Sequence, residues 1–337
     1  MDGRERSIAW VGGMYFMEDM RDQGFRPVAL PLTGPAVLGF EDIVQRLGFA
    51  PDAVVYTDRS LPPPLVGLER FPCLTAFYCI DSHIHSWYPL YARSFDLCAV
   101  SLRDHVDAFA RALGQDRVAW LPPFAARHHR PRQADTEFDL LFVGTVDPET
   151  TPLRCDFLSR LGRLAPGLAV RQGSFPELMP RARVVLNIAE RGDLNFRVFE
   201  ALACGACLLT PELEHGQNEL FTPGEHFATY RADDAEDCAA KARELLDDPQ
   251  RCEALAQAGL RAVDTAHRPR HRARALAALL RQGLDAGLAE RRLATPDLAL
   301  RRELRLLWLH WAEHSDNPAL AARYLAEARR LAGGARP

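Results

Sequence analysis

The sequence predicts an α/β protein with two successive, doubly wound parallel sheets and a helical extension after the second sheet. Three observations lead to this fold class. Short β-rich runs alternate with helical stretches through residues 1–120, the alternation restarts near residue 139, and no strand pattern appears after about residue 233. Such an alternation places parallel strands in one sheet with helices on both of its faces.

The first half of the chain forms a domain that we expect at residues 1–130. Its strands are expected in the runs SIAWV, RPVAL, DAVVY, CLTAFY and LCAVS. Its helices are expected at Tyr15 to Gln23, at Phe40 to Leu47 and in RDHVDAFARAL. The polar, proline-containing run RHHRPRQADTE has no apolar periodicity, so it is interpreted as the linker to a second domain.

The second domain is expected at residues 131–284. Its strands are expected in DLLFVG, LAVRQ, VVLNIA and CLLT, and its helices around Pro152 to Leu161 and in NFRVFEALACG. Both domains are therefore predicted to be Rossmann-like. Because such sheets bind ligands at the carboxyl ends of their strands, two of them in succession predict a ligand cleft between the domains.

The remaining residues, 285–337, are expected to form a helical extension. Asp233-Asp234 and Asp248-Pro249 are placed to begin the preceding helices, and two amphipathic helices then flank the turn at Ser315 to Pro318. This hairpin is similar to a tetratricopeptide unit, but no second copy follows at a fixed period. Two interpretations stay open, a structural cap on the second domain and a docking surface for a protein partner.

Composition excludes several classes of function. The chain has 337 residues, 47% hydrophobic and 26% charged, with a formal net charge of -4, so no basic excess indicates nucleic-acid binding. The basic runs RHHRPR and HRPRHRAR lack alternating aromatic residues and are interpreted as solvated or interdomain segments. Lys241 is the single lysine, which excludes a GxxxxGK[ST] phosphate loop and disfavours Schiff-base chemistry.

The sequence also indicates the cellular compartment in which the protein is expected. The N-terminal residues lack the apolar region of a signal peptide, and no run reaches the roughly 18 apolar residues of a membrane span. The eight cysteines are scattered and do not form a compact disulfide framework, and Cys204-x-x-Cys207 has no second pair that would complete a zinc site. We therefore expect a cytoplasmic protein with reduced thiols.

The most informative segment is LNIAERGDLNFRVFEALACGACLLT, residues 186–210. A strand is expected to end near Ile188 and a helix to begin at Asn195 and Phe196, so that free N–H groups at the helix start can bind a diphosphate. Arg197 in the first turn can add a bidentate phosphate contact, and Glu200 can accept hydrogen bonds from ribose hydroxyls. The alternative is a surface ion pair between Arg197 and Glu200.

The run NFRVFEALACGACLLT, with the LFTPGEHF turn and the helices that follow it, resembles the C-terminal domain of group 1 glycosyltransferases of the GT-B fold. It is most similar to the branch that contains the spore maturation protein CgeB, and the resemblance covers about residues 139–280. The resemblance implies transfer of a sugar, of the hexosyl type, from a nucleotide diphosphate sugar to an unidentified acceptor. It implies no cofactor, since GT-B enzymes as a class need no metal to hold the diphosphate.

In that family, the glutamate that opens E-A-x-x-x-G binds the nucleotide ribose, which implies this role for Glu200. A second glutamate often stands eight residues earlier, where this chain has Gly192, and Glu190 and Asp193 are the nearest substitutes. The family's arginine and lysine pair is incomplete here. Arg197, together with Gly144 and Thr145 after the strand DLLFV, is the replacement that we expect, although Gly144 could instead form a simple turn.

Two segments of the first domain complete the predicted site. Gly12 and Gly13 directly follow the first strand, where missing side chains let a ligand or the other domain approach the backbone. The run DSHIHSWY follows CLTAFYCI and offers Asp81, His83 and His85 as candidates for the base that activates an acceptor hydroxyl. A metal pair at His83 and His85 and a structural hydrogen-bond network are the alternatives.

Three functions therefore remain open after the sequence. The first is glycosyl transfer to an acceptor that could be a protein, a glycan, a lipid or a small molecule. The second is a nucleotide-sugar epimerase on the same scaffold, which would need no acceptor. The third is a catalytically degenerate binding subunit. The missing glutamate at Gly192 and the helical extension favour this function.

Overall fold

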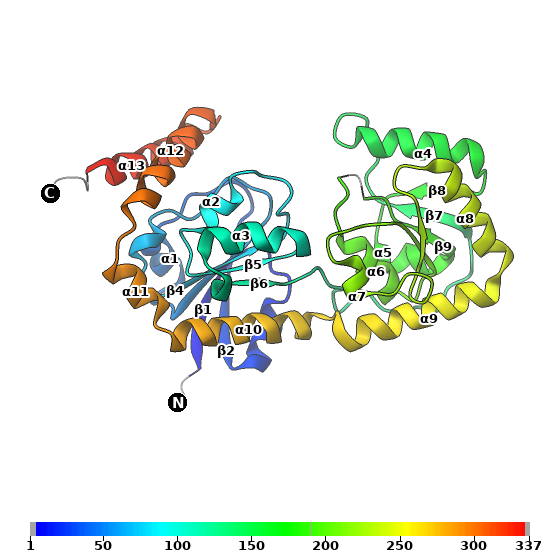
Figure 1. Cartoon of the computed structure of the whole chain (residues 1–337), viewed down its shortest axis with the longest axis horizontal. Helices are drawn as coiled ribbons and strands as arrows, with labels where there is room; N and C mark the ends of the chain where they lie inside the picture. The colour runs from blue at the N-terminus through cyan, green and yellow to red at the C-terminus, as the bar shows by residue number, and fades with distance from the viewer. Residues whose placement is uncertain (1–4, 190, 334–337) are drawn as a thin grey trace. The chain divides into compact units, whose positions relative to one another are not determined.

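The computed structural model describes residues 5–189 and 191–333 (Figure 1). Contacts divide the chain into two compact units. Unit 1 comprises Met1–Pro122 and Arg272–Pro337, and unit 2 comprises Pro123–His271. The predicted domain boundaries lie near residues 130 and 284, whereas the contacts change from one unit to the other at Pro122 and His271.

Unit 1 contains a six-stranded parallel sheet in the order β2-β1-β3-β4-β5-β6. All five strands expected in the first half are confirmed, and a short sixth strand follows them. The strands are β1 (Arg6–Gly12), β2 (Phe25–Pro31), β3 (Ala53–Thr57), β4 (Leu74–Cys79), β5 (Leu97–Val100) and β6 (Val118–Trp120). The inner strands β3, β4 and β5 are buried along their whole length, as expected for a sheet covered on both faces.

The helices of this unit follow the expected alternation. The α-helices are α1 (Phe40–Leu47), α2 (Tyr88–Ala92), α3 (Val106–Leu113), α10 (Pro269–Asp285) and α11 (Leu288–Ala294), the first three residues of α10 belonging to unit 2. Short 3-10 helices lie at η1 (Met17–Gln23), η2 (Leu68–Arg70), η3 (Arg103–His105) and η4 (Gln115–Arg117). The helix expected from Tyr15 is thus a 3-10 helix that begins at Met17.

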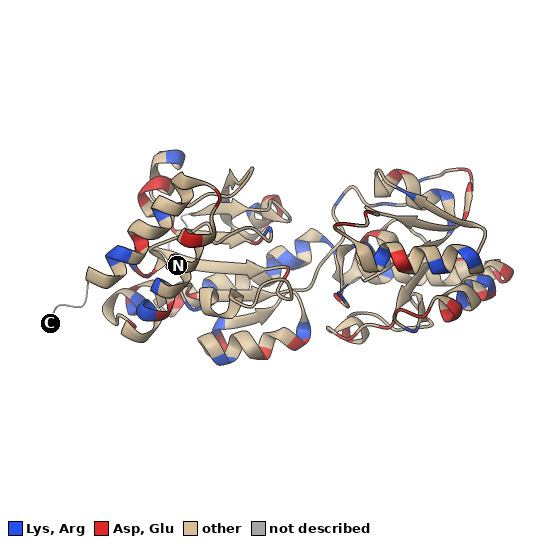
Figure 2. Ribbon diagram, turned by 90° about the horizontal axis from the view of Figure 1, so that it is seen from above, with Lys and Arg blue, Asp and Glu red and all other residues tan. Residues whose placement is uncertain are grey.

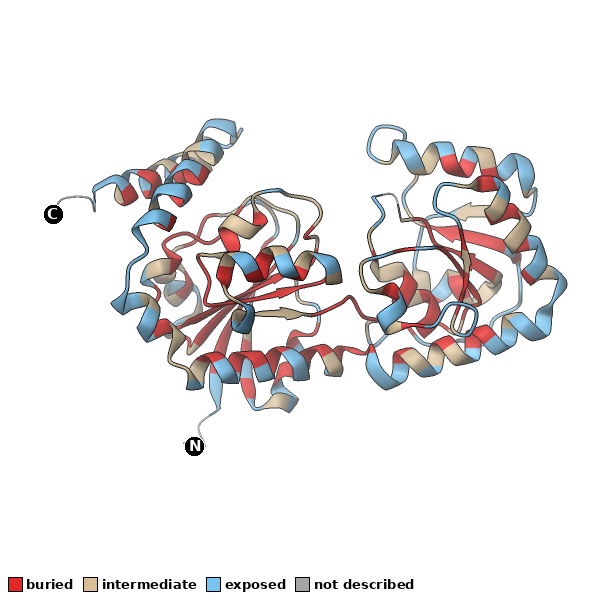
Figure 3. Ribbon diagram, viewed as in Figure 1, coloured by how far each residue is buried: buried red, intermediate tan, exposed pale blue. Residues whose placement is uncertain are grey.

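The C-terminal hairpin is confirmed as α12 (Leu298–His314) and α13 (Pro318–Gly333), and it belongs to unit 1. Trp308 is buried, 6.0 Å from the ring of Tyr91, and the Tyr324 hydroxyl donates to the carbonyl of Pro63 at 3.0 Å. The interpretation as a cap on the second domain is therefore wrong. The apolar stripe of the hairpin, visible as buried positions in Figure 3, covers the aromatic core around Phe77 and Phe95 instead.

Unit 2 contains a five-stranded parallel sheet in the order β11-β10-β9-β7-β8. Four of its strands were expected. The strands are β7 (Phe138–Val143), β8 (Leu168–Arg171), β9 (Ala182–Leu186), β10 (Leu208–Pro211) and β11 (Ala228–Tyr230). The unexpected β11 is three residues long, so its sequence shows too little periodicity to predict a strand.

Helices again separate these strands. They are α4 (Pro152–Leu164), α5 (Phe175–Leu178), α6 (Phe196–Ala203), α7 (Gln217–Leu220), α8 (Ala235–Asp247) and α9 (Pro249–Ala266), with the 3-10 helix η5 (Met179–Arg181). Asp234 caps α8 and Asp248 caps α9, each by accepting a hydrogen bond from a backbone N–H in the first turn, as expected.

Acidic and basic residues are interspersed along the helices of both units, as Figure 2 shows. This distribution agrees with the small net charge of -4. Within residues 5–189 and 191–333, no helix combines the length and the apolar character that crossing a membrane requires.

Candidate functional site

The strand order of unit 2 creates a switch point between β7 and β9. From β7 the chain continues to β8 on one side, and from β9 it continues to β10 on the other. The loops that leave these two strands therefore diverge at their carboxyl ends. In doubly wound sheets a crevice at this position is the usual place for a ligand.

Arg197, in the first turn of α6, spans this switch point. Its Nε donates to the carbonyl of Val143 at the end of β7 at 3.0 Å. Its Nη1 donates to Oδ1 of Asn187 at 3.1 Å and to the carbonyl of Ile188 at 3.3 Å, both just after β9. Within the described residues Nη2 makes no hydrogen bond. The two strand ends thus hold the guanidinium in place and leave one of its amino groups for a ligand.

The environment of Arg197 favours an anionic ligand. Burial lowers the pKa of the guanidinium to about 10, with a further contribution from the charge of Arg154, so it remains protonated at neutral pH. The cation lies 4.9 Å from the centre of the Phe142 ring. No ion pair neutralises Arg197 in the described part of the chain, and the predicted alternative of a pair with Glu200 is not formed. A largely buried and unneutralised cation is stabilised when an anion binds beside it.

Asn187 is a residue of the candidate site that the sequence motifs do not indicate. It is fully buried, and its Nδ2 donates to the hydroxyl of Thr210 at 3.0 Å while Oδ1 accepts from Arg197. Its carbonyl accepts from the hydroxyl of Tyr230 at 2.9 Å. A polar residue inside the apolar run VVLNIA was the signal that could have identified it, because buried amides need several partners.

Gly144 and Thr145 follow β7 beside Arg197. A Cβ atom at Gly144 would lie 2.9 Å from Nη2 of Arg197 and 3.0 Å from the ring of Phe142. The glycine therefore provides the space in which the free end of Arg197 lies. Thr145 is exposed, and its carbonyl accepts a hydrogen bond from Nη1 of Arg154 at 2.8 Å.

Asn195 occupies the N-cap position of α6, which begins at Phe196 as expected. Its side chain does not cap the helix; Nδ2 donates to the carbonyl of Ile188 at 3.3 Å, and Oδ1 is buried without a hydrogen bond in the described residues. Asn195 therefore supplies no side-chain cap to the first turn of α6. Phe196 packs edge-to-face on Phe124, with ring centres 5.6 Å apart.

Glu200 lies one turn further along α6, with 14% of its side chain exposed. Burial raises its pKa to about 7, and the charge of Arg197 opposes this shift. Its Oε1 lies 3.7 Å from Nε2 of His129. Burial, with the charges of His128 and Arg268, lowers the pKa of His129 to about 4. The imidazole is therefore neutral at pH 7, and this contact is not an ion pair there.

His129 belongs to the run that was interpreted as a linker. Residues 127–137 have no helix or strand, as expected, but His129 is buried in unit 2. Its carbonyl accepts a hydrogen bond from Nη1 of Arg268 at 2.7 Å, and Arg268 is also buried. These members of the two basic runs are therefore structural parts of unit 2 rather than solvated side chains.

The positions proposed to replace the family's second glutamate are only partly described. Glu190 lies outside the described residues. Gly192 is exposed, with a positive φ of 75°, and Asp193 is half-buried.

Unit 1 brings Asp81 and His85 together at one serine. Both lie in the loop after β4, and His83 is half-buried in the same loop. Oδ2 of Asp81 accepts a hydrogen bond from the hydroxyl of Ser60 at 2.5 Å, and Nε2 of His85 lies 3.4 Å from the Ser60 carbonyl. Oδ1 of Asp81 has no hydrogen bond within the described residues, so it remains available to accept a proton.

Asp58, after β3, is a fully buried carboxylate beside the half-buried Asp81, and no sequence motif indicated it. Its oxygens accept from the hydroxyl of Tyr88 at 2.8 Å, from the N–H of Ser60 at 2.8 Å and from the N–H of Asp81 at 3.3 Å. Burial raises the pKa of Asp58, and the negative charge of Asp81 contributes. Asp58 thus holds the backbone of both residues that form the Ser60–Asp81 hydrogen bond.

Gly12 and Gly13 lie at the end of β1, where the chain passes close to β3. A Cβ at Gly12, which has a φ of 101°, would lie 2.2 Å from the carbonyl oxygen of Thr57. A Cβ at Gly13 would lie 2.1 Å from the ring of Tyr15. Close packing inside unit 1 therefore already requires glycine at Gly12, whereas a side chain at Gly13 would have to displace the ring of Tyr15.

Comparisons with known proteins concern the family of residues 137–278 and the fold of the whole chain. Residues 137–278 match a family described as glycosyl transferase-like. The chain matches none of the curated proteins. The pneumococcal O-GlcNAc transferase GtfA, solved with UDP and GlcNAc, is similar at a TM-score of 0.53 and 11% identity. That match covers 69% of this chain and 57% of GtfA, so the chain spans little more than half of GtfA's length.

Two further structures match over their whole length. Sucrose-phosphate synthase from Thermosynechococcus elongatus has a TM-score of 0.58 and 12% identity, over 83% of this chain and 100% of its own. HepE from Anabaena, solved with UDP and glucose, has a TM-score of 0.58 and 12% identity, over 82% of this chain and 100% of its own. Residues 137–278 therefore resemble a glycosyl transferase-like domain, and the two parallel-sheet units have the GT-B fold.

Proposed function

We propose that this protein is a glycosyltransferase that moves a sugar from a nucleotide diphosphate sugar to the hydroxyl group of an acceptor. The observation that carries the proposal is the position of Arg197, which is held by both strand ends at the switch point of a glycosyl transferase-like domain. Its charge is not neutralised by any carboxylate in the described residues, and one amino group is free for a diphosphate.

Unit 2 would bind the donor. When the bond between sugar and diphosphate breaks, negative charge grows on the diphosphate, and Nη2 of Arg197 and the uncapped first turn of α6 would stabilise it. Glu200 would accept hydrogen bonds from the ribose hydroxyls. Because these groups supply the positive potential, the proposal includes no metal. GtfA and HepE were solved with UDP, which makes UDP-sugars the first donors to test.

Unit 1 would bind the acceptor. In a transfer with inversion, a base removes the proton of the acceptor hydroxyl as its oxygen attacks the anomeric carbon. Asp81 is our first candidate because Ser60 holds one of its oxygens and leaves the other available. His83 and His85 in the same loop are the other candidates.

The proposal has finer parts that rest on sequence motifs. We place the protein in the bacterial-type, CgeB-like branch because of the R-x-F-E-A-L-A-C-G helix, and we expect a hexosyl donor for the same reason. We also propose a cytoplasmic site of action. All eight cysteines are free thiols, six of them buried, which suits a reducing compartment.

The first experiment is a thermal-unfolding panel of UDP, GDP, dTDP, CMP and their common sugar conjugates, each with magnesium and with EDTA. A ligand at 100 times its Kd should add about 2.7 kcal/mol of stability. We expect one nucleotide to raise the melting temperature selectively. The rise should be the same in EDTA as with magnesium. The variant Arg197→Gln should lose the shift, while Arg163→Gln, which alters an exposed arginine of α4, should keep it.

Gly192 favours a second candidate, a degenerate GT-B subunit that binds a partner without catalysing transfer. The exposed Gly192 offers no carboxylate to a donor sugar. If no nucleotide of the panel raises the melting temperature, this second function is supported over the first. An epimerase, by contrast, would bind a sugar nucleotide and convert it with no acceptor present, which analysis of the products would reveal.

A further inference from the structure

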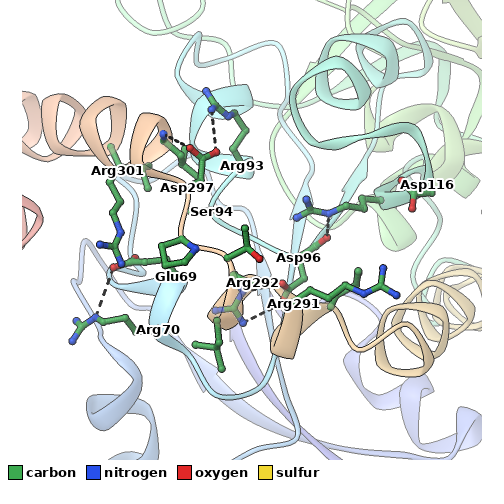
Figure 4. Close-up of a pocket in the computed structure, with 17 residues that line it drawn as sticks. Glu69, Arg70, Arg93, Ser94, Asp96, Asp116, Arg291, Arg292, Asp297 and Arg301 are labelled. Atoms are coloured by element: carbon green, nitrogen blue, oxygen red, sulfur yellow. Dashed lines mark hydrogen bonds and ion pairs between the residues drawn. The ribbon is translucent and has the colours of Figure 1, made fainter. Parts of the chain in front are cut away.

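A cavity of about 580 Å³ opens at the surface of unit 1, away from the candidate base (Figure 4). One side is formed by η2 and by the residues that connect α2 to β5, and the other by α11 and the start of α12. Cavities of this size hold small metabolites. The C-terminal segment therefore does more than cover the aromatic core, because it closes a pocket.

This cavity lies at the amino-terminal edge of the sheet. Asp96, in its wall, directly precedes β5, and Arg70 lies before β4. Asp81, in contrast, follows the carboxyl end of β4. The strand β4 has six residues, so about 20 Å separates the two ends. A ligand in this cavity cannot be the hydroxyl group that Asp81 would deprotonate.

The wall of the cavity has an excess of positive charge. Six of its residues are arginines and four are acidic: Arg70, Arg93, Arg117, Arg291, Arg292, Arg301, Glu69, Asp96, Asp116 and Asp297. Most of these arginines form ion pairs or hydrogen bonds within unit 1. Arg292 pairs with Asp96 at 2.8 Å, and Arg93 pairs with Glu303 at 2.6 Å. Arg117 binds backbone carbonyls, and Arg70 lies 3.7 Å from Glu69.

Two arginines of the cavity wall differ from these four in their contacts. Within the described residues, the guanidinium groups of Arg291 and Arg301 take part in no hydrogen bond or ion pair. Figure 4 shows Arg301 extending from α12 toward Glu69, and Arg291 on the other side of the cavity. The Nε of Arg301 is buried and has no acceptor. A buried donor on a charged group is unfavourable until an acceptor binds it.

We propose that this cavity binds a small phosphate-bearing anion, with Arg301 as its principal ligand and Arg291 as a second. Phosphate oxygens match the planar fork of arginine, and a dianion would balance the two unpaired cations. A concave pocket between packed elements suits a small anion better than a nucleic-acid backbone or a membrane surface. The bound anion would link α12 to the sheet edge and so stabilise the attachment of the C-terminal helices.

The test uses inorganic pyrophosphate in isothermal titration calorimetry at constant ionic strength. It is carried out in the Arg197→Gln variant, so that binding at the switch point of unit 2 does not contribute. We expect one site in this variant. Adding Arg301→Gln should weaken binding at least tenfold, and adding Arg291→Gln should weaken it less. The matched control is Arg302→Gln, because Arg302 is the exposed neighbour of Arg301 and does not line the cavity.

Thermal unfolding separates a binding role from a structural one. Since Arg301 has no partner in the described residues, Arg301→Gln should leave the melting temperature without ligand unchanged or higher, and should remove the rise that pyrophosphate causes. The proposal is wrong if the Arg197→Gln variant binds no pyrophosphate, or if Arg301→Gln and Arg302→Gln bind it equally. Neither outcome bears on the proposed transferase function, which is tested with nucleotides at Arg197.

Discussion

Oδ1 of Asn187 accepts a hydrogen bond from Nη1 of Arg197 at 3.1 Å, so a neutral amide and not a carboxylate orients the buried cation of unit 2. An aspartate at this position would hold the arginine in the same place but would cancel its charge. The choice of amide therefore keeps the positive potential at the switch point for a ligand.

The first prediction concerns this amide. Asn187→Asp should preserve the hydrogen bond yet weaken UDP binding at least tenfold, because the carboxylate neutralises Arg197. Asn187→Ala should also weaken binding and should lower the free energy of unfolding by about 1–3 kcal/mol, because Nη1 of Arg197 loses an acceptor and the hydroxyl oxygen of Thr210 loses its donor. Calorimetry with UDP and thermal unfolding measure the two effects. Equal UDP affinity in Asn187→Asp and the wild type would contradict this role.

The second prediction concerns the pH dependence of nucleotide binding. The pKa of Glu200 is raised to about 7 by burial, and only the ionised carboxylate accepts hydrogen bonds from both ribose hydroxyls. UDP affinity should therefore increase by about tenfold between pH 6 and pH 8. Glu200→Gln should bind more weakly and show no such increase. An identical pH profile in both proteins would exclude Glu200 from the ribose site.

The same group has a measurable effect on stability without ligand. The folded-state pKa of about 7 lies above the ordinary value of 4.5, so between these pH values the folded protein holds a proton that the unfolded chain has released. Stability from this group therefore falls as the pH rises from about 4.5 to about 7, by about 3 kcal/mol. Glu200→Gln should consequently be more stable than the wild type at pH 8 and nearly equal to it at pH 4.5.

The third prediction concerns Gly144. A methyl group there would lie 2.9 Å from Nη2 of Arg197 and 3.0 Å from the buried ring of Phe142, and the φ of 159° at Gly144 is one that a residue with a side chain rarely adopts. Gly144→Ala should lower the free energy of unfolding by about 1–3 kcal/mol and should also weaken UDP binding clearly. Gly162→Ala in α4 is the control, since a methyl group at Gly162 meets nothing within 4 Å. Similar UDP affinities in the two variants would show that the space beside Arg197 is not used.

The fourth prediction concerns the base. Asp81→Asn should reduce turnover about 100-fold or more while UDP affinity stays unchanged. Ser60→Ala should cause a smaller loss, because it frees the oxygen that Ser60 holds. Release of UDP from a UDP-sugar, with water as the acceptor, provides the assay until the natural acceptor is identified. Full activity of Asp81→Asn would move the search to His83 and His85.

The fifth prediction concerns the C-terminal hairpin. Trp308→Ala should lower the stability of unit 1 by about 3–5 kcal/mol, because Trp308 is buried against Tyr91 and Tyr324. Leu306→Ala should change little, since Leu306 is 64% exposed on the same helix. Thermal unfolding measures both. A small effect of Trp308→Ala would indicate that the hairpin is only loosely attached to unit 1.

The fold was predictable because its signals are local. The β-rich runs and the caps at Asp234 and Asp248 each depend on a few neighbouring residues. The surface on which the hairpin packs was not predictable, because Trp308 contacts Tyr91, which lies more than 200 positions earlier in the chain. Nor does an amphipathic pattern identify the surface that its apolar stripe will cover.

Some residues of the candidate site were predictable from local sequence, and others were not. The start of α6 and the positions of Arg197 and Glu200 followed from one continuous motif. Asn187 and Asp58 were missed because their importance comes from contacts with distant residues, Thr210 in one case and Tyr88 in the other. His129 was misjudged because a polar run predicts solvent exposure, and only the tertiary structure shows that its imidazole is buried.

The discontinuity of unit 1 has a consequence for synthesis. Unit 2 is a continuous stretch, Pro123–His271, and all its strands and helices are available once that stretch has been translated. Unit 1 is made first but must wait for α10 to α13, which supply Trp308 and Tyr324 to its core. Because domains fold as units, the first part to leave the ribosome should be the last to mature. Until then its apolar surface is exposed to chaperones and proteases.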